Sequence, residues 1–337
     1  MSNNSYNISA DGPFFVLAPM DDVTDAVFRQ VVADCAAPDL FFTEFVNVDG
    51  LQSRGREKLL PKVRFTVKDQ PLIVQIWGKN PENFYKTCVQ VADGSMAREV
   101  GLPEGVNFAG VDLNMGCPAK SEVQNGTCSA LIIPTNRGLA VEIIDASREG
   151  LEAGKGQSPA SLPLSTKTRL GYNEVDYTWH EMLLSKKLNM LTVHGRTKKQ
   201  MSKVPAEWEK IEEVRKLRDQ ISPATLIVGN GDVLSRSQGE ELASKHGLDG
   251  IMIGRGIFHD PYVFAKDTPW ESIERKDRIA LFRKHVQLFA DTWQNNERRM
   301  VTLNKFCKIY INGFDGAKEM REKLMFCESI VELLRLL

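Results

Sequence analysis

The 337-residue sequence lacks several patterns that would define a protein class at once. Its six cysteines are scattered without a CxxC pair, so we expect neither a metal site nor a disulfide framework. The same pattern indicates a reducing compartment. No apolar run approaches the ~18 residues of a membrane span. The N-terminal stretch MSNNSYNISADGP has neither the basic nor the apolar region of a secretory signal. These absences predict a cytoplasmic protein without membrane contact.

A strong charge imbalance and the common glycine motifs for nucleotides are missing too. The net charge of −1 gives no overall attraction to nucleic acid, so RNA binding would need a local basic cluster. No GxGxxG follows the first apolar run, which disfavours an open doubly wound sheet, and no P-loop is present for ATP. With 42% hydrophobic and 26% charged residues, the composition is that of an ordinary globular protein.

Short apolar or β-branched runs recur along the chain at intervals that suit a strand, a helix and two loops. Helical patterns separate them, which predicts parallel pairing through right-handed crossovers. Eight such units over about 260 residues predict an α/β protein with a (β/α)8 TIM barrel, whose usual size is ~250 residues. The predicted strands are Phe14–Met20, Leu40–Val46, Pro71–Trp77, Gly110–Asn114, Leu162–Arg169, Met190–His194, Thr225–Gly229 and Gly250–Ile253.

The pattern changes after the eighth run. From about Trp270 there is no strand signal, and apolar residues follow helical spacing in Ile279–Trp293, Val301–Asn312 and Met320–Leu336. We therefore expect a barrel domain over residues 1–268 and a small all-helical domain over residues 269–337. Two loops are predicted inside the barrel, over 93–107 and over 150–161, and the second is rich in Gly, Ser and Pro.

Polar residues gather where the predicted strands end. The active site of a TIM barrel is built from the loops that follow its strands, so these residues should meet at one end. Any one of them can be a solvated strand end, but the coincidence over all eight strands favours a site. In chain order they are Pro19 and Met20, Glu44, Gln75, Asn114 and Cys117, Lys167 and Arg169, His194 and Arg196, Asn230 to Asp232, and Gly254 to Gly256.

The glycines after the last two strands predict a phosphate site. Gly231 and Gly254 lie where barrels often hold a phosphate on backbone N–H groups, and Arg255 would add a charge-assisted contact. Tight turns that need glycine are the alternative. Lys167 would stabilise negative charge on a reduced flavin, and Gln75 can donate and accept at the polar edge of such a ring.

Cys117 follows the fourth strand between glycine and proline, in the loop Asn114-Met115-Gly116-Cys117-Pro118. The sequence leaves open whether it is a nucleophile, a metal ligand or a proton donor. A free thiol with a pKa of ~8.5 is mostly protonated at neutral pH, so it can act directly as a general acid. Cys128, eleven residues further on, is interpreted as a packing residue.

Together these motifs resemble the flavin-dependent tRNA-dihydrouridine synthases, in family order over residues 14 to 264. The most specific combination is the Cys117 loop followed by K-x-R-x-G after the fifth strand and H-x-R-T after the sixth. The motifs are LAPM (17–20), VQ (74–75), DLNMGCP (112–118), KTRLG (167–171), HGRT (194–197), GNGD (229–232) and GRG (254–256).

The resemblance implies that the protein reduces specific uridines in tRNA to 5,6-dihydrouridine, with FMN as cofactor and NADPH as its reductant. A hydride would reach C6 of the uracil from reduced FMN, and Cys117 would donate a proton to C5 from the opposite face. The implied cofactor-binding residues are Pro19, Met20, Asp21, Gln75, Lys167, His194, Asn230, Gly231, Asp232, Gly254 and Arg255. Asp21 departs from the family pattern and can equally cap the next helix.

The segments expected to bind the substrate are a basic loop and the helical region. Implied substrate-binding residues are Asn114, Arg169, Arg196, Lys198 and Lys199, the last two in a loop whose charges would favour RNA phosphates. We expect a monomer that binds tRNA. Three alternatives remain: an FMN-dependent TIM-barrel reductase or dehydrogenase acting on a small molecule, an RNA-binding factor without turnover, and, more weakly, a phosphosugar isomerase.

Overall fold

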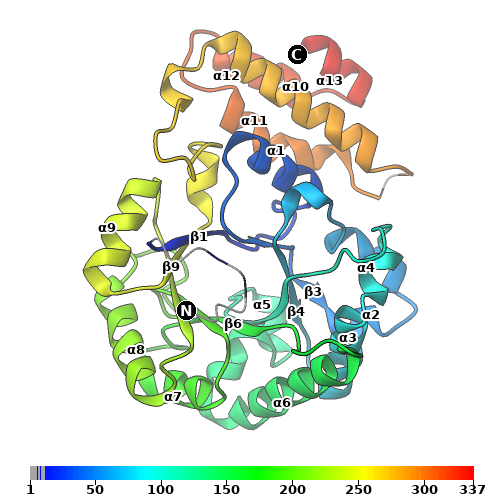
Figure 1. Cartoon of the computed structure of the whole chain (residues 1–337). Coiled ribbons are helices and arrows are strands. Elements are labelled where there is room, and N and C mark those ends of the chain that lie inside the picture. Colours follow the sequence, from blue (N-terminus) through cyan, green and yellow to red (C-terminus); the bar gives the residue numbers. More distant parts are fainter. Residues whose placement is uncertain (1–5, 7, 9–11, 296) are drawn as a thin grey trace.

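The computed structural model describes residues 6, 8, 12–295 and 297–337 and shows a closed parallel barrel surrounded by helices (Figure 1). The strands pair in the order β1-β9-β8-β7-β6-β5-β4-β2, and a bridge between Val16 and Leu40 returns the sheet to β1. The predicted TIM barrel is therefore confirmed. The strands are β1 (Phe14–Leu17), β2 (Phe41–Phe42), β3 (Val46–Asn47), β4 (Leu72–Trp77), β5 (Gly110–Met115), β6 (Leu164–Arg169), β7 (Met190–His194), β8 (Leu226–Asn230) and β9 (Gly250–Ile253).

The second predicted strand is wrong in one respect, because Leu40–Val46 is interrupted. Both β2 and β3 pair with β4, and residues 43–45 between them are not part of a strand, although the Thr43 N–H still donates to the Ile73 carbonyl at 2.9 Å. The hydroxyl of Thr43 accepts from the Gln75 N–H at 3.1 Å and donates to the carbonyl of Glu44 at 2.6 Å. These side-chain bonds replace part of the strand pairing at the end of the barrel where the site lies.

Strand alternation explains how the barrel acquires a polar end. Successive residues face opposite sides of a strand, so Phe15 packs with the outer helices while Phe14 and Val16 pack inside the barrel. The inner apolar cluster also contains Ile73 and Val228. Two residues further along β4 and β8, on the same inward side, come Gln75 and Asn230. An apolar floor is therefore followed by a polar layer at the carboxyl end of the barrel.

The helices that surround the barrel are amphipathic segments with short caps. Asp25 caps α1 by accepting from the Phe28 N–H at 2.8 Å, so this role does not fall to Asp21. The helices are α1 (Ala26–Ala36), α2 (Val48–Leu51), α3 (Pro81–Ala92), α4 (Ser95–Glu99), α5 (Lys120–Gln124), α6 (Arg137–Gly154), α7 (Tyr177–Ser185), α8 (Trp208–Ile221) and α9 (Arg236–His246).

The two predicted loops contain helix. Residues 95–99 of the first form α4, and residues 150–154 of the second belong to α6. A Cβ on Gly150 would lie 2.3 Å from the carbonyl oxygen of Tyr85, and one on Gly154 would lie 2.5 Å from that of Val89. Here glycine allows α6 to approach α3 closely, whereas the sequence pattern suggested that it ends the helix.

The C-terminal region is helical and gathers on one side of the barrel beside α1 (Figure 1). It comprises α10 (Arg275–Thr292), α11 (Asn304–Tyr310), α12 (Ala317–Met325) and α13 (Ile330–Leu336), so the third predicted helix is in fact two. Phe306 packs against Phe28 of α1 with ring centroids 4.8 Å apart. In the described part of the chain, no helix is long and apolar enough to cross a membrane.

A buried charged contact joins this region to the barrel. The guanidinium of Arg298 pairs with Glu44, which is fully buried, and lies 3.7 Å from carboxylate oxygens of Asp22 and Asp25. Arg298 also lies over the ring of Trp293 at 4.9 Å. The C-terminal region is thus attached directly beside the polar end of the barrel.

Candidate functional site

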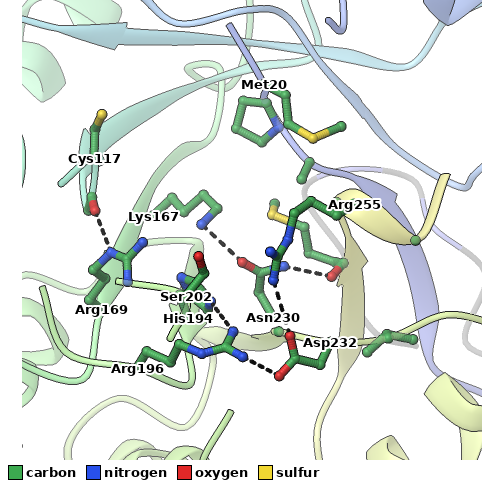
Figure 2. Close-up of a pocket in the computed structure, with 18 of the residues that line it drawn as sticks. Met20, Cys117, Lys167, Arg169, His194, Arg196, Ser202, Asn230, Asp232 and Arg255 are labelled. Atoms are coloured by element: carbon green, nitrogen blue, oxygen red, sulfur yellow. Dashed lines mark hydrogen bonds and ion pairs between the residues drawn. The ribbon is translucent and has the colours of Figure 1, made fainter. Parts of the chain in front are cut away.

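A cavity of about 610 Å³ lies at the carboxyl ends of the strands (Figure 2). Its volume is in the range of cofactor and small-ligand sites. Asp21, Lys198 and Lys199 do not line it. The predicted residues that do are Pro19, Met20, Gln75, Asn114, Cys117, Lys167, Arg169, His194, Arg196, Asn230, Gly231, Asp232, Gly254 and Arg255.

The Cys117 loop is held from both sides. The side-chain oxygen of Asn114 accepts from the backbone N–H groups of Gly116 at 3.1 Å and of Cys117 at 2.9 Å. Arg169 donates to the carbonyl of Gly116 at 2.8 Å and, through another nitrogen, to those of Thr197 and Met201. Arg169 therefore ties the loop after β5 to the loop after β7. The backbone of Cys117 is therefore held in place at the cavity that this residue lines.

Cys128 is more than a packing residue. The neighbouring Cys128 thiol lowers the pKa of Cys117 to about 7, against the opposing effect of burial. The Ala119 N–H and Arg169 lower it further, while Glu122 raises it. Cys128 is buried and has a left-handed backbone with φ of 53°. Cys117 is therefore a stronger acid than a free thiol.

Lys167 places a cation in the barrel mouth, away from Cys117 in the view of Figure 2. Its amine donates to the side-chain oxygen of Asn230 at 3.2 Å. Burial, and then the nearby Arg169, lower the pKa of Lys167 to about 8, while Asp112 and Cys117 oppose that shift. The amine is therefore still mostly protonated at neutral pH. Asn230 is fixed in turn by donating to the carbonyl of Met252 at 2.8 Å.

A chain of polar contacts forms the opposite wall. Arg196 lies 3.1 Å from Nε2 of His194, and since arginine only donates, this nitrogen accepts and the ring proton sits on Nδ1. Burial and the surrounding cations hold the pKa of His194 well below its usual range, so the ring is neutral. Asp232 pairs with both Arg196 and Arg255, which joins the loops after β7, β8 and β9.

The glycine loops leave backbone donors unused. Among the residues that the structure describes, no protein acceptor pairs with the N–H of Gly231 or of Arg255, and both residues line the cavity. A Cβ on Gly231 would lie 2.6 Å from that of Ala206, so this turn requires glycine. Free N–H groups beside an exposed guanidinium suit a phosphate. Lys167 adds a cation in the same cavity. The residues present therefore fit a flavin with a phosphate tail.

The three predicted residues outside the cavity lining have other surroundings. Asp21 is exposed and paired with Lys62. Lys198 lies 4.9 Å from the ring centre of Tyr172, and Lys199 is exposed on the same loop. Two buried polar residues beneath the site, Asp112 and Ser165, were not predicted as site residues. The lining residues that were not predicted are Phe45, Ser202, Val233, Leu234, Met252 and His259. The position of Asp112 and Ser165 could have been found from the strands that carry them. The alternation of β5 and β6 places these last two on the inward face, and this signal was available in the sequence.

The comparisons with known proteins agree with this geometry. The sequence profile of the family described as "Dihydrouridine synthase (Dus)" matches residues 16–337. The "Probable tRNA-dihydrouridine synthase" of Staphylococcus aureus (strain COL) is 42% identical over 328 residues, which cover 96% of this chain and 92% of that protein. The "Probable tRNA-dihydrouridine synthase 2" of Bacillus subtilis (strain 168) is 41% identical over 329 residues, with 96% and 93% covered.

A solved structure of morphinone reductase is a much weaker match, with a TM-score of 0.47 at 11% identity, covering 74% of this chain and 84% of that one. The family profile spans nearly the whole chain, and the relatives match it over almost their full length. The chain belongs to the dihydrouridine synthase family.

Proposed function

We propose that FMN binds in the cavity, that NADPH reduces it, and that Cys117 is the proton donor when the C5–C6 double bond of a tRNA uridine is reduced to 5,6-dihydrouridine. As a member of the dihydrouridine synthase family, the chain is a flavin-dependent oxidoreductase of tRNA modification. The observation that supports these residue roles is a shared cavity. Cys117, Lys167 and the glycine loops with their unused N–H donors all line it.

Two hydrogen equivalents must reach the double bond, one as a hydride and one as a proton. When bound, the reduced flavin supplies the hydride for C6. Cys117 supplies the proton for C5, and the thiolate that it becomes is stabilised by the Cys128 thiol and the Ala119 N–H. Lys167 would supply the positive charge that stabilises a bound flavin as negative charge grows on it during reduction. A neutral His194 offers an Nδ1–H donor without adding a further cation.

The activity is tested by measuring the dihydrouridine content of unmodified tRNA after incubation with the protein, FMN and NADPH. We expect product with the parent and its loss, or a large slowing, with Cys117→Ala. Cys35→Ala is the matched control, because Cys35 is half-buried on α1, outside the cavity lining. NADPH oxidation without dihydrouridine would instead favour a reductase of small molecules. The flavin released on denaturation identifies FMN by its chromatographic retention.

For the RNA side, we propose that the helical region over residues 269–337 and the loop carrying Lys198 and Lys199 bind tRNA. We propose further that the reaction takes place in the cytoplasm. Replacing both lysines by alanine should weaken tRNA binding. It should also reduce the slope of the logarithm of the binding constant against the logarithm of the salt concentration, by about 1 for each lost phosphate contact. Lys245→Ala, exposed on α9, serves as control. An unchanged salt slope in the double variant would remove this loop from the proposed interface.

A further inference from the structure

A directed string of hydrogen bonds runs beneath the cavity from the Cys117 loop into the barrel. The backbone N–H groups of Gly116 and Cys117 donate to Oδ1 of Asn114, so its Nδ2 faces inward and donates to Oε1 of Gln75 at 3.1 Å. Nε2 of Gln75 then donates to Oδ2 of Asp112 at 2.7 Å.

Both ends of the string have a fixed polarity. A backbone N–H can only donate and an ionised carboxylate can only accept, so neither amide in between can be turned around without placing donor against donor or acceptor against acceptor. The other oxygen of Asp112 accepts from the Ser165 hydroxyl at 2.6 Å, and Asp112 is fully buried. Burial raises the pKa of Asp112 to about 6, and Lys167 nearby works against that shift.

The string leaves one N–H of Gln75 and one of Asn114 without an acceptor among the described residues, and both side chains line the cavity. We propose that Asp112 is a positioning residue that holds the Gln75 amide with its free N–H toward the ring carbonyls of the flavin. Asp112 does not itself touch the ring, because it lies behind Gln75 and outside the cavity lining. This inference rests on the proposed binding of FMN.

Two substitutions separate the proposed role from a general effect of the charge. Asp112→Asn keeps an acceptor for Gln75 and offers an amide donor to the Ser165 hydroxyl oxygen, so it should retain FMN affinity within about threefold. Asp112→Leu removes the acceptor and frees the Gln75 amide to turn, so the dissociation constant of FMN should rise about tenfold. If the carboxylate acted only as a countercharge for Lys167, both variants would lose affinity equally.

The measurement is a titration of apo-protein with FMN, followed by flavin fluorescence. In a Gln75→Met background, Asp112→Leu should cause no further loss, because the residue through which it acts is gone. Independent, multiplying losses would overturn the proposal, as would equal losses for Asp112→Asn and Asp112→Leu. Thr192→Val is the matched control: Thr192 is also buried in the barrel, and its hydroxyl has no hydrogen-bond partner among the described residues.

A second double variant covers the case in which Asp112→Leu does not fold. Gln75→Glu combined with Asp112→Asn keeps the buried string satisfied, because the new Asn can turn and donate to the new Glu. The N–H toward the cavity is replaced by a carboxylate oxygen that cannot donate, so FMN should bind at least about tenfold more weakly than to Asp112→Asn alone. Equal affinity would overturn the donor orientation. If the parent itself binds no FMN, the proposed cofactor fails, whatever the variants do.

Discussion

The pair of Arg298 and Glu44 tests how the helical region is held on the barrel. Glu44 is fully buried and the Arg298 side chain is 7% exposed, so both charges are almost removed from water. Among the residues that the structure describes, Arg298→Met would leave the Glu44 carboxylate with only the Asp22 N–H at 2.7 Å and Lys62 at 3.9 Å. Breaking one side of a buried pair costs about 3–5 kcal/mol.

That cost converts to a measurable shift in melting temperature. With an unfolding entropy of about 2.1 cal/mol/K per residue over 337 residues, Arg298→Met should lower the midpoint by about 4–7 °C. Differential scanning calorimetry of the apo-protein provides the measurement. Lys245→Met removes an exposed charge instead and should change the midpoint by less than about 1 °C.

Two further results would decide whether the cause is an unpaired buried charge. The double variant Arg298→Met/Glu44→Gln should recover part of the loss, because Glu44 no longer carries a buried charge, while the buried Asp25 carboxylate still lacks Arg298. Burial already raises the pKa of Glu44, with Arg298 opposing, so removing Arg298 raises it more. A raised carboxyl pKa costs stability only where the group is ionised, so the deficit should shrink as the pH falls and Glu44 becomes protonated. A double variant as unstable as the single one, or a deficit independent of pH, would refute the reasoning.

Three other predictions concern the cavity. Cys128→Ala should raise the pKa of Cys117 from about 7 toward the ~8.5 of a free thiol, measured as the pH midpoint of site-specific alkylation; an unchanged midpoint would contradict the thiol contact. Gly231→Ala should destabilise the protein by about 1–3 kcal/mol in thermal unfolding, and by more than Gly101→Ala, which shares a positive φ but would meet no neighbour within 4 Å. FMN affinity should fall as the pH rises through the Lys167 pKa of about 8, and Lys167→Arg should remove that dependence because arginine stays charged; the same decline in both proteins would exclude Lys167 as its origin.

Most of the barrel could be predicted because its strands are short apolar runs bounded by turn residues, and strand ends in a parallel barrel converge by geometry. The sequence was misleading where tertiary contacts outweigh local preference. Gly150 and Gly154 continue α6 because α3 lies against them, and Thr43 interrupts a strand by bonding the neighbouring backbone. Arg298 meets Glu44 across 254 positions of the chain, and no local pattern carries that information.

Cys128 illustrates a different limit. Its thiol reaches Cys117 because a short 3-10 turn, Cys128–Ile132, begins with a left-handed residue beside β5, a conformation that residue type does not predict. Asp112 and Ser165, in contrast, follow from strand alternation alone. Inward positions of a strand could therefore be read from sequence, whereas the approach of one loop to another could not.

The surroundings of Trp293 give the molecule a built-in optical signal. Two guanidiniums lie over its indole, that of Arg64 on the barrel at 5.0 Å and that of Arg298 in the C-terminal region at 4.9 Å, and the residue is 6% exposed. Tryptophan emission responds to nearby charge and to water, so the intensity and wavelength from this ring depend on both cations staying in place. Replacing the other four tryptophans by phenylalanine would leave a single fluorophore. Its emission would then report, without any added label, whether the helical region shifts against the barrel when an RNA is engaged.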